Sequence, residues 1–100
     1  MDKEYNRLIG KKLRYCRKTV NITQKQMGEI ISVNARQISR YENGETIISV
    51  STLSMFALAF EIPMEDFANE YLSLDNFKEW YPEAHFKVFE PTYQFFWGER

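Results

Sequence analysis

Residues 23–44, TQKQMGEIISVNARQISRYENG, constrain the fold of this chain more than any other stretch. Thr23, with Gln26 three residues later, is typical of a helix N-terminus, and Asn34 predicts a second N-terminus after a short turn. Gly44 suits the position that directly follows a helix. The stretch therefore predicts two short helices joined by a tight turn.

The second of these helices, over residues 35–43, has two chemically different sides. Ile38 and Tyr41 form an apolar side that a core can anchor, while Arg36 and Arg40 lie on a cationic side. Arginine presents a planar fork that matches O6 and N7 of guanine, and the DNA major groove admits one helix. This helix therefore has the residue types that reading a major groove requires.

Charge is divided unevenly along the chain, which the overall balance of −1 conceals. Residues 1–44 contain ten Lys or Arg and four acids, whereas residues 45–100 contain three Lys or Arg and ten acids. The basic half favours double-stranded DNA as its partner, and the acidic half would be repelled by duplex phosphates.

The same composition argues against several other functions. Cys16, the single cysteine, falls on an apolar stripe and is expected in the core, and the single histidine, His85, cannot form a histidine-rich metal site. No glycine-rich phosphate loop or nucleophile constellation is present. We therefore expect no enzyme activity, cofactor or metal. Residues 1–20 are too charged for a signal peptide, and no apolar run reaches transmembrane length, so a cytoplasmic protein without a membrane partner is expected.

The periodicity predicts an all-α fold with five helices in residues 1–71. An amphipathic helix over residues 3–19 comes first, and its Lys11 and Lys12 are expected on the polar side. Beyond the two central helices, Ser49 should cap a fourth, and a fifth should begin near Pro63 and continue to Tyr71. Residues 1–71 are thus expected to form the DNA-binding domain, followed by a C-terminal extension over residues 72–100.

Three motifs follow one another at defined spacing: Leu13-Arg14-x-x-Arg17, Ile22-Thr23-Gln24-x-x-Met27 and Val33-Asn34-x-x-x-Ile38-Ser39-x-Tyr41-Glu42-Asn43-Gly44. With them, residues 10–67 resemble the helix-turn-helix family of phage repressor and Cro proteins, also called XRE-like regulators. The resemblance implies a repressor-like fold and a sequence-specific transcriptional regulator, a repressor. Because one such motif reads only a few base pairs, a homodimer on paired half-sites is expected.

The resemblance also implies that seven residues face the DNA. The base-reading positions are Ala35, Arg36 and Arg40. The flanking or backbone-contacting positions are Gln24, Gln37, Ser39 and Asn43. Among these, Gln24 would hydrogen-bond a phosphate beside the groove.

Two further positions match the structural ion pair of the family, Arg17 and Glu42, which would tie the first helix to the end of the third. Gly28 stands where the family usually has alanine, and we expect it to permit closer packing against the third helix. Ser32 stands where the turn usually has glycine, so a positive φ there would be mildly strained. The loop over residues 45–48 lacks the basic residues of many relatives.

The C-terminal extension is rich in aromatic residues, since ten of the sixteen lie in residues 71–100. A short helix is expected over residues 75–81, followed by an extended arm that could form a β-strand. So many aromatics must cover the chain's own core, a second copy, or a different protein such as a toxin. The residues expected in a dimer or partner contact are Phe86, Phe89, Tyr93, Phe95 and Trp97. An antitoxin or adaptor that binds DNA for autoregulation is therefore the alternative function.

Overall fold

Every regular element in the described part of the protein, residues 3–82 of the computed structural model, is an α-helix. In chain order the helices are α1 (Lys3–Thr19), α2 (Gln24–Ile31), α3 (Ala35–Glu42), α4 (Val50–Phe60), α5 (Met64–Ala68) and α6 (Leu74–Trp80). The predicted all-α fold class is confirmed, and the short helix expected over residues 75–81 corresponds to α6. The arm expected over residues 86–97 lies outside the described residues.

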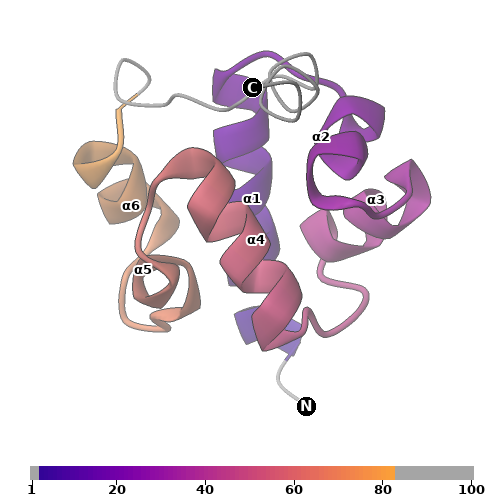
Figure 1. Ribbon diagram of the computed structural model, residues 1–100. Coiled ribbons are helices and arrows are strands. Elements are labelled where there is room, and N and C mark those ends of the chain that lie inside the picture. Colours follow the sequence, from indigo (N-terminus) through magenta and orange to yellow (C-terminus); the bar gives the residue numbers. More distant parts are fainter. Residues whose placement is uncertain (1–2, 83–100) are drawn as a thin grey trace.

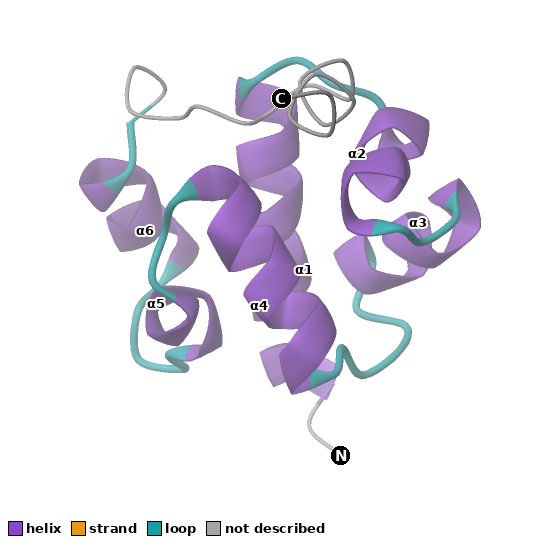
Figure 2. Cartoon of the chain, in the orientation of Figure 1, coloured by secondary structure: helices purple, strands orange, loops and turns teal. Residues whose placement is uncertain are grey.

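The long helix α1 runs through the middle of the molecule, with other helices on both sides of it (Figure 1). α2 and α3 pack against each other on one side, and α3 also contacts α1. α5 and α6 contact α1 on the other side, while α4 contacts both α2 and α5. Figure 2 shows that short loops join the helices. The two helices of the motif are therefore held by α1 and α4 together.

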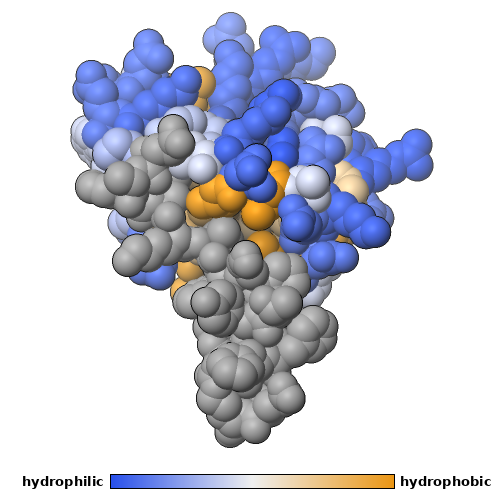
Figure 3. All heavy atoms as spheres, turned by 90° about the horizontal axis from the view of Figure 1, so that it is seen from above, coloured by the Kyte–Doolittle hydropathy of each residue, from blue (hydrophilic) through white to orange (hydrophobic). Residues whose placement is uncertain are grey.

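The core is one continuous group of buried apolar side chains to which all six helices contribute. Its fully buried members include Leu13, Met27, Ile38, Phe56, Phe67 and Phe77. On the face shown in Figure 3, hydrophilic side chains cover most of the described surface, and apolar ones gather in one small area. None of the helices in residues 3–82 has the length and apolar character that crossing a lipid bilayer requires.

Lys12 departs from the prediction that it lies on the polar side of α1, because its side chain is completely buried. Its ammonium group donates to the backbone carbonyl oxygens of Asp66 at 2.9 Å, Phe67 at 3.4 Å and Asn69 at 3.0 Å. It also lies 5.5 Å from the centre of the Phe77 ring. Three donors of one cation thereby satisfy carbonyls at the C-terminal end of α5, where a helix leaves acceptors unpaired.

This contact also explains why the fifth helix is shorter than predicted. α5 ends at Ala68, whose carbonyl accepts a hydrogen bond from the hydroxyl of Tyr5 at 2.7 Å. Asn69 is extended, with φ −73° and ψ 109°. Tyr71, predicted on the apolar side of a longer helix, is 89% exposed, and Leu72 is buried in its place. Side chains of α1 donate hydrogen bonds to the last carbonyls of α5, so α5 ends at Ala68.

α6 packs on the same core as the helices before it. The Phe77 ring is fully buried and lies 5.3 Å from the ring of Phe67 and 6.2 Å from that of Tyr15. The hydroxyl of Tyr15 donates to the carbonyl of Tyr81 at 2.8 Å, and the hydroxyl of Tyr81 donates to the Asp66 carboxylate. Residues 72–82 therefore share one core with the helices of residues 3–71, although the expected domain boundary falls between residues 71 and 72.

Candidate nucleic-acid interface

Side-chain caps set the start of both helices in the motif. The hydroxyl of Thr23 accepts from the backbone N–H of Gln26 at 3.0 Å, and the Gln26 side chain accepts from the N–H of Thr23 at 2.8 Å. Asn34 accepts from the N–H of Gln37 at 2.8 Å. The predicted capping box and the predicted second N-cap are confirmed. These caps satisfy donors that each helix start would otherwise leave unpaired.

The turn between α2 and α3 is unusually close. Ser32 adopts a left-handed conformation, φ 64° and ψ 41°, as its place in the turn predicted. A Cβ atom at Gly28 would lie only 2.2 Å from the carbonyl oxygen of Val33. The close neighbour of Gly28 is thus the turn, not the third helix as expected. Absence of a side chain at residue 28 lets the turn fold back onto α2.

Gly10 has a similar role where α1 crosses the end of α3. A Cβ atom there would lie 2.4 Å from the carbonyl oxygen of Tyr41 and 2.6 Å from that of Glu42. Such contacts with backbone atoms leave no room for any side chain at this crossing. The C-terminal end of α3 therefore sits directly against the backbone of α1.

Arg17 of α1 and Glu42 at the end of α3 form a buried ion pair. Nε of Arg17 lies 2.6 Å from Oε2 of Glu42, and Nη2 donates to Oε1 at 2.9 Å. Nη1 of Arg17 donates to the carbonyl of Ile22 at 2.8 Å. Removing one charge from a pair of this kind costs about 3–5 kcal/mol, because the other charge stays buried without a partner. The pair thus holds α3 against α1.

Gln24 of α2 joins the same carboxylate. Its Nε2 donates to Oε1 of Glu42 at 3.1 Å, so one carboxylate links α1, α2 and α3. The expected role of Gln24 was a hydrogen bond to phosphate. An amide nitrogen carries two hydrogens, so within residues 3–82 one donor of Gln24 has no partner and is available for that role, while the other orients the side chain.

α3 presents its two arginines to solvent. Arg36 and Arg40 are exposed, whereas Ile38 and Tyr41 on the same helix are buried. Within residues 3–82, neither guanidinium forms an ion pair or a hydrogen bond. Ala35 is half-buried next to them. The exposed side of α3 therefore carries two cationic groups whose N–H donors are available to a ligand.

The other residues expected near DNA surround this side of α3. Gln37 and Ser39 are half-buried, and Asn43 is exposed directly after the helix. Nδ2 of Asn43 lies 3.4 Å from the hydroxyl of Ser39 and 3.4 Å from a carboxylate oxygen of Glu45. The side chain of Asn43 is thus oriented by one neighbour on each side.

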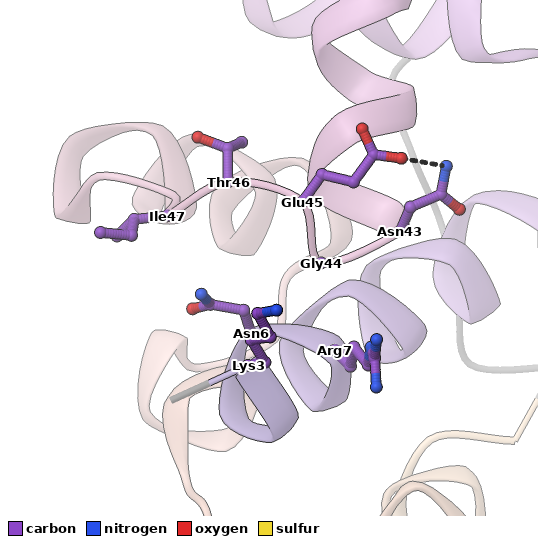
Figure 4. Close-up of a pocket in the computed structure, with 8 residues that line it drawn as sticks. All are labelled: Lys3, Asn6, Arg7, Asn43, Gly44, Glu45, Thr46 and Ile47. Atoms are coloured by element: carbon purple, nitrogen blue, oxygen red, sulfur yellow. Dashed lines mark hydrogen bonds between the residues drawn. The ribbon is translucent and has the colours of Figure 1, made fainter. Parts of the chain in front are cut away.

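Figure 4 shows an open hollow at this end of α3, bounded by the first turns of α1 and the loop after Asn43. Its volume is about 560 Å³. Lys3 and Arg7 of α1 line it opposite Glu45. The sequence showed that this loop lacks basic residues; the fold brings two cations from α1 beside it, which sequence spacing alone could not indicate.

Fewer basic side chains reach the surface than the number of Lys and Arg in residues 1–44 suggests. Lys12 is buried beneath α5, and the charge of Arg17 is compensated by Glu42. The exposed basic residues among residues 3–44 are Lys3, Arg7, Lys11, Arg14, Lys18, Lys25, Arg36 and Arg40. These eight side chains can attract the phosphate backbone, which dominates the salt-dependent part of protein–DNA affinity.

Residues 3–82 provide neither a reactive thiol nor a group of metal ligands. Cys16 is completely buried, and burial raises the pKa of its thiol well above the ordinary range, so the thiol stays protonated. No group of three or more His, Cys, Asp or Glu side chains is placed to hold a metal ion in this part of the chain. His85 lies outside the described residues.

This chain belongs to the helix-turn-helix family, whose model matches residues 13–67. The matched range covers α2, α3 and α4 completely, together with the part of α1 that carries Arg17. The family assignment made from the three sequence motifs is confirmed. The protein therefore carries a DNA-binding domain of the helix-turn-helix type.

Among curated proteins, the chain is similar to antitoxin PezA of Streptococcus pneumoniae serotype 4 (strain ATCC BAA-334 / TIGR4). The two are 30% identical over 63 residues, which is 63% of this chain and 40% of the antitoxin. The chain thus matches less than half the length of that relative. No solved structure matches the chain at a significant level.

Proposed function

We propose that this protein is a sequence-specific transcriptional repressor that reads the DNA major groove with α3 and binds as a homodimer. The observation that carries the proposal is the exposure of Arg36 and Arg40. Both are exposed on α3 without partners among residues 3–82, while the opposite side of the helix is anchored by Ile38 and Tyr41. A rigid helix with free, forked donors matches the requirements of base recognition.

Each residue on this side of α3 has a distinct role in the proposed complex. Arg36 and Arg40 donate paired hydrogen bonds to O6 and N7 of guanine, the commonest specific contact in the major groove. Ala35 is small enough to let the helix approach and can contact a thymine methyl group. Gln37 and Ser39 lie beside these three residues. Together they read the bases in the centre of each half-site.

Contacts to the sugar–phosphate backbone position the helix without reading sequence. The free N–H of Gln24 binds a phosphate at the start of α2, and Asn43 binds another just past α3. A homodimer places a second copy of α3 about one helical turn away on the same face of the duplex. Repression follows because a bound dimer blocks other proteins from the same DNA.

Arg36→Ala and Arg40→Ala should each weaken binding to the preferred DNA site by about 1–3 kcal/mol, because a bidentate contact to one base pair is lost. The preferred site is first selected from a random DNA pool, and affinity is then measured by fluorescence anisotropy. Each variant should also lose its preference at one base position.

Lys78→Ala is the matched control, because Lys78 is an exposed cation on α6 rather than on α3. It should leave the base preference unchanged. If the arginine variants lose affinity equally on the selected site and on random DNA, the two arginines act only as phosphate contacts and the base-reading role is wrong.

The similarity to antitoxin PezA favours one alternative, an antitoxin that binds another protein and uses its DNA contact for autoregulation. The aromatic segment after residue 82 is the part proposed to contact that protein. Purification of the tagged chain from its own cells would test this. A partner that remains bound at high salt and is lost when residues 83–100 are removed supports the antitoxin function.

A further inference from the structure

α4 and the segment that leads into it carry no charge, and the nearest charged residues are Glu45 before and Glu61 directly after them. Residues 46–60 contain no Asp, Glu, Lys, Arg or His, although 27% of the chain is charged. Charged side chains normally cover the solvent side of a surface helix. Depletion of charge is instead typical of the central part of protein–protein interfaces. The outer side of α4 therefore has the composition of a contact surface.

The exposed side chains of this region are apolar or small and uncharged: four are apolar, and the other three are the serines Ser49, Ser51 and Ser54. Val50 is 71% exposed and Leu58 is 73% exposed, and Ser54 is exposed midway between them. These three residues are spaced by four, so they lie above one another along the helix. Ile47 and Met55, 57% and 42% exposed, extend the same apolar surface. We call this set of five residues the α4 face.

Two hollows adjoin the α4 face, one near each end. Beside Leu58, a hollow of about 380 Å³ is lined by Ser54, Ala57, Leu58, Glu61, Ile62 and Met64. Near Val50, a second hollow of about 160 Å³ lies between α4 and α1, with Leu53 and Ile9 in its wall. The face thus combines projecting apolar side chains with recesses next to them. A surface that has both can pack against a copy of itself.

We infer that the α4 face is where two copies of this chain meet in the homodimer, with their α4 helices antiparallel about a two-fold axis near Ser54. The small Ser54 at the centre lets the two helices approach, and Val50 of each copy then packs against Leu58 of the other. A surface without charge can face itself without repulsion. An acidic or basic partner, in contrast, would find no opposite charge on it.

This inference rests on the homodimer of the proposed function and adds the surface that forms it. α4 has 11 residues and is therefore about 16 Å long. A pair of such helices buries less than the roughly 1,600 Å² of a standard stable interface. The copies should therefore associate weakly in solution, and adjacent half-sites on DNA would bring them together.

Sedimentation equilibrium of the full chain should show a reversible monomer–dimer equilibrium. Leu58→Lys and Val50→Lys should each weaken association by about tenfold or more, because a charge is placed in an uncharged contact. A mixture of Val50→Lys with Leu58→Glu should regain the dimer, since residue 50 of one copy faces residue 58 of the other. Tyr71→Lys, at an exposed aromatic outside α4, is the matched control and should leave association unchanged.

The substituted side chains are mostly exposed, so circular dichroism should show the same helix content in every variant. A wild-type chain that stays monomeric in solution and also binds DNA with two adjacent half-sites as a monomer would refute this inference together with the proposed homodimer, but not the base reading by α3. A dimer that persists in Leu58→Lys, or a mixture that fails to associate, would refute the α4 face alone. Persistence of the dimer is also the result expected if residues 83–100 join the copies.

A cross-link tests the axis without disturbing the apolar contacts. Ser54→Cys in the full chain should form a symmetric disulfide between copies under mild oxidation, because Cα atoms about 4.4–6.8 Å apart can be bridged. The native Cys16 is completely buried and cannot compete. Glu70→Cys, exposed outside α4, is the control and should not cross-link at the same protein concentration. Equal cross-linking of both variants would contradict the proposed axis.

Discussion

Lys12 is a charged residue that the structure places in the apolar core. It lies among Ile9, Leu13 and Cys16 of α1, and its ammonium group is enclosed by carbonyls from the end of α5 and by the Phe77 ring. Burial lowers the pKa of Lys12 from 10.5 to about 8, an effect that the nearby Asp66 carboxylate partly opposes. A buried cation of this kind makes the stability of the fold depend on pH.

The sign of that dependence follows from the number of bound protons. Below about pH 8 Lys12 is protonated in both the folded and the unfolded chain. Between about pH 8 and pH 10.5 the unfolded chain keeps the proton that the folded chain has lost. The contribution of Lys12 to the free energy of unfolding therefore rises with pH in this window.

Lys12→Met should remove this contribution. Relative to the variant, the wild-type chain should gain about 2 kcal/mol in free energy of unfolding between pH 7 and pH 9.5. Urea unfolding at the two pH values measures it. Cys16 and Tyr81 have raised pKa values, so the unfolded chain loses their protons at lower pH than the folded chain does, and their contribution to the free energy of unfolding falls as pH rises. Both proteins contain these two residues, so this opposite trend cancels in the comparison.

Lys11→Met is the matched control for this pH dependence. Lys11 is the neighbouring residue on α1 and is exposed. Its replacement should leave the change in the free energy of unfolding between the two pH values as it is in the wild type. Parallel pH curves for wild type and Lys12→Met would show that the buried ammonium does not titrate in this window.

The helix-turn-helix element depends on backbone geometry as much as on its caps. The turn brings the Val33 carbonyl against Gly28, and it requires a left-handed backbone at Ser32. Alanine at residue 28 would favour the helical conformation by about 1 kcal/mol. The contact with the turn opposes that gain, because the obstructing atom belongs to the backbone and cannot rotate away.

Gly28→Ala should therefore destabilise the protein by more than about 1 kcal/mol in spite of the better helix propensity. Ser32→Gly should act in the opposite direction and stabilise it by about 0.5–1 kcal/mol, since glycine adopts positive φ without strain. Urea unfolding of both variants gives the comparison. A stabilising effect of Gly28→Ala would mean that the turn is looser than the structure shows.

At the scale of the whole molecule, α6 completes the core on the side of α1 away from the motif. Phe77 fills the space between Phe67 and Tyr15, and it covers the ammonium of Lys12. Without this ring, a buried cation and two aromatic side chains would face water. Residues beyond 71 therefore stabilise the DNA-binding domain in addition to any role in association.

Phe77→Ala should reduce the free energy of unfolding by about 3–5 kcal/mol, because it leaves a cavity in the core. Trp80→Ala is the control on the same helix, since that side chain is 54% exposed, and it should cost about 0.5 kcal/mol or less. Thermal and urea unfolding measure both. If both substitutions lower the free energy of unfolding by similarly small amounts, α6 does not belong to the core.

Local residue chemistry was enough to predict most elements of this fold. The caps Thr23, Asn34 and Ser49 act on backbone N–H groups within three residues, so they could be recognised from spacing alone. The side of α3 that carries Arg36 and Arg40 follows from helical periodicity. The family motifs confirm the same segment as a helix-turn-helix.

Tertiary structure decided the features that join distant parts of the chain. Periodicity predicted Lys12 on the polar side of α1, whereas the structure buries it and gives its charge hydrogen-bond partners among carbonyls more than fifty residues away. The end of α5 and the exposure of Tyr71 follow from the same contact. The sequence by itself determined the helices and the cationic side of α3, because these depend on neighbouring residues. Which side chains satisfy the helix ends and close the core depended on packing between helices.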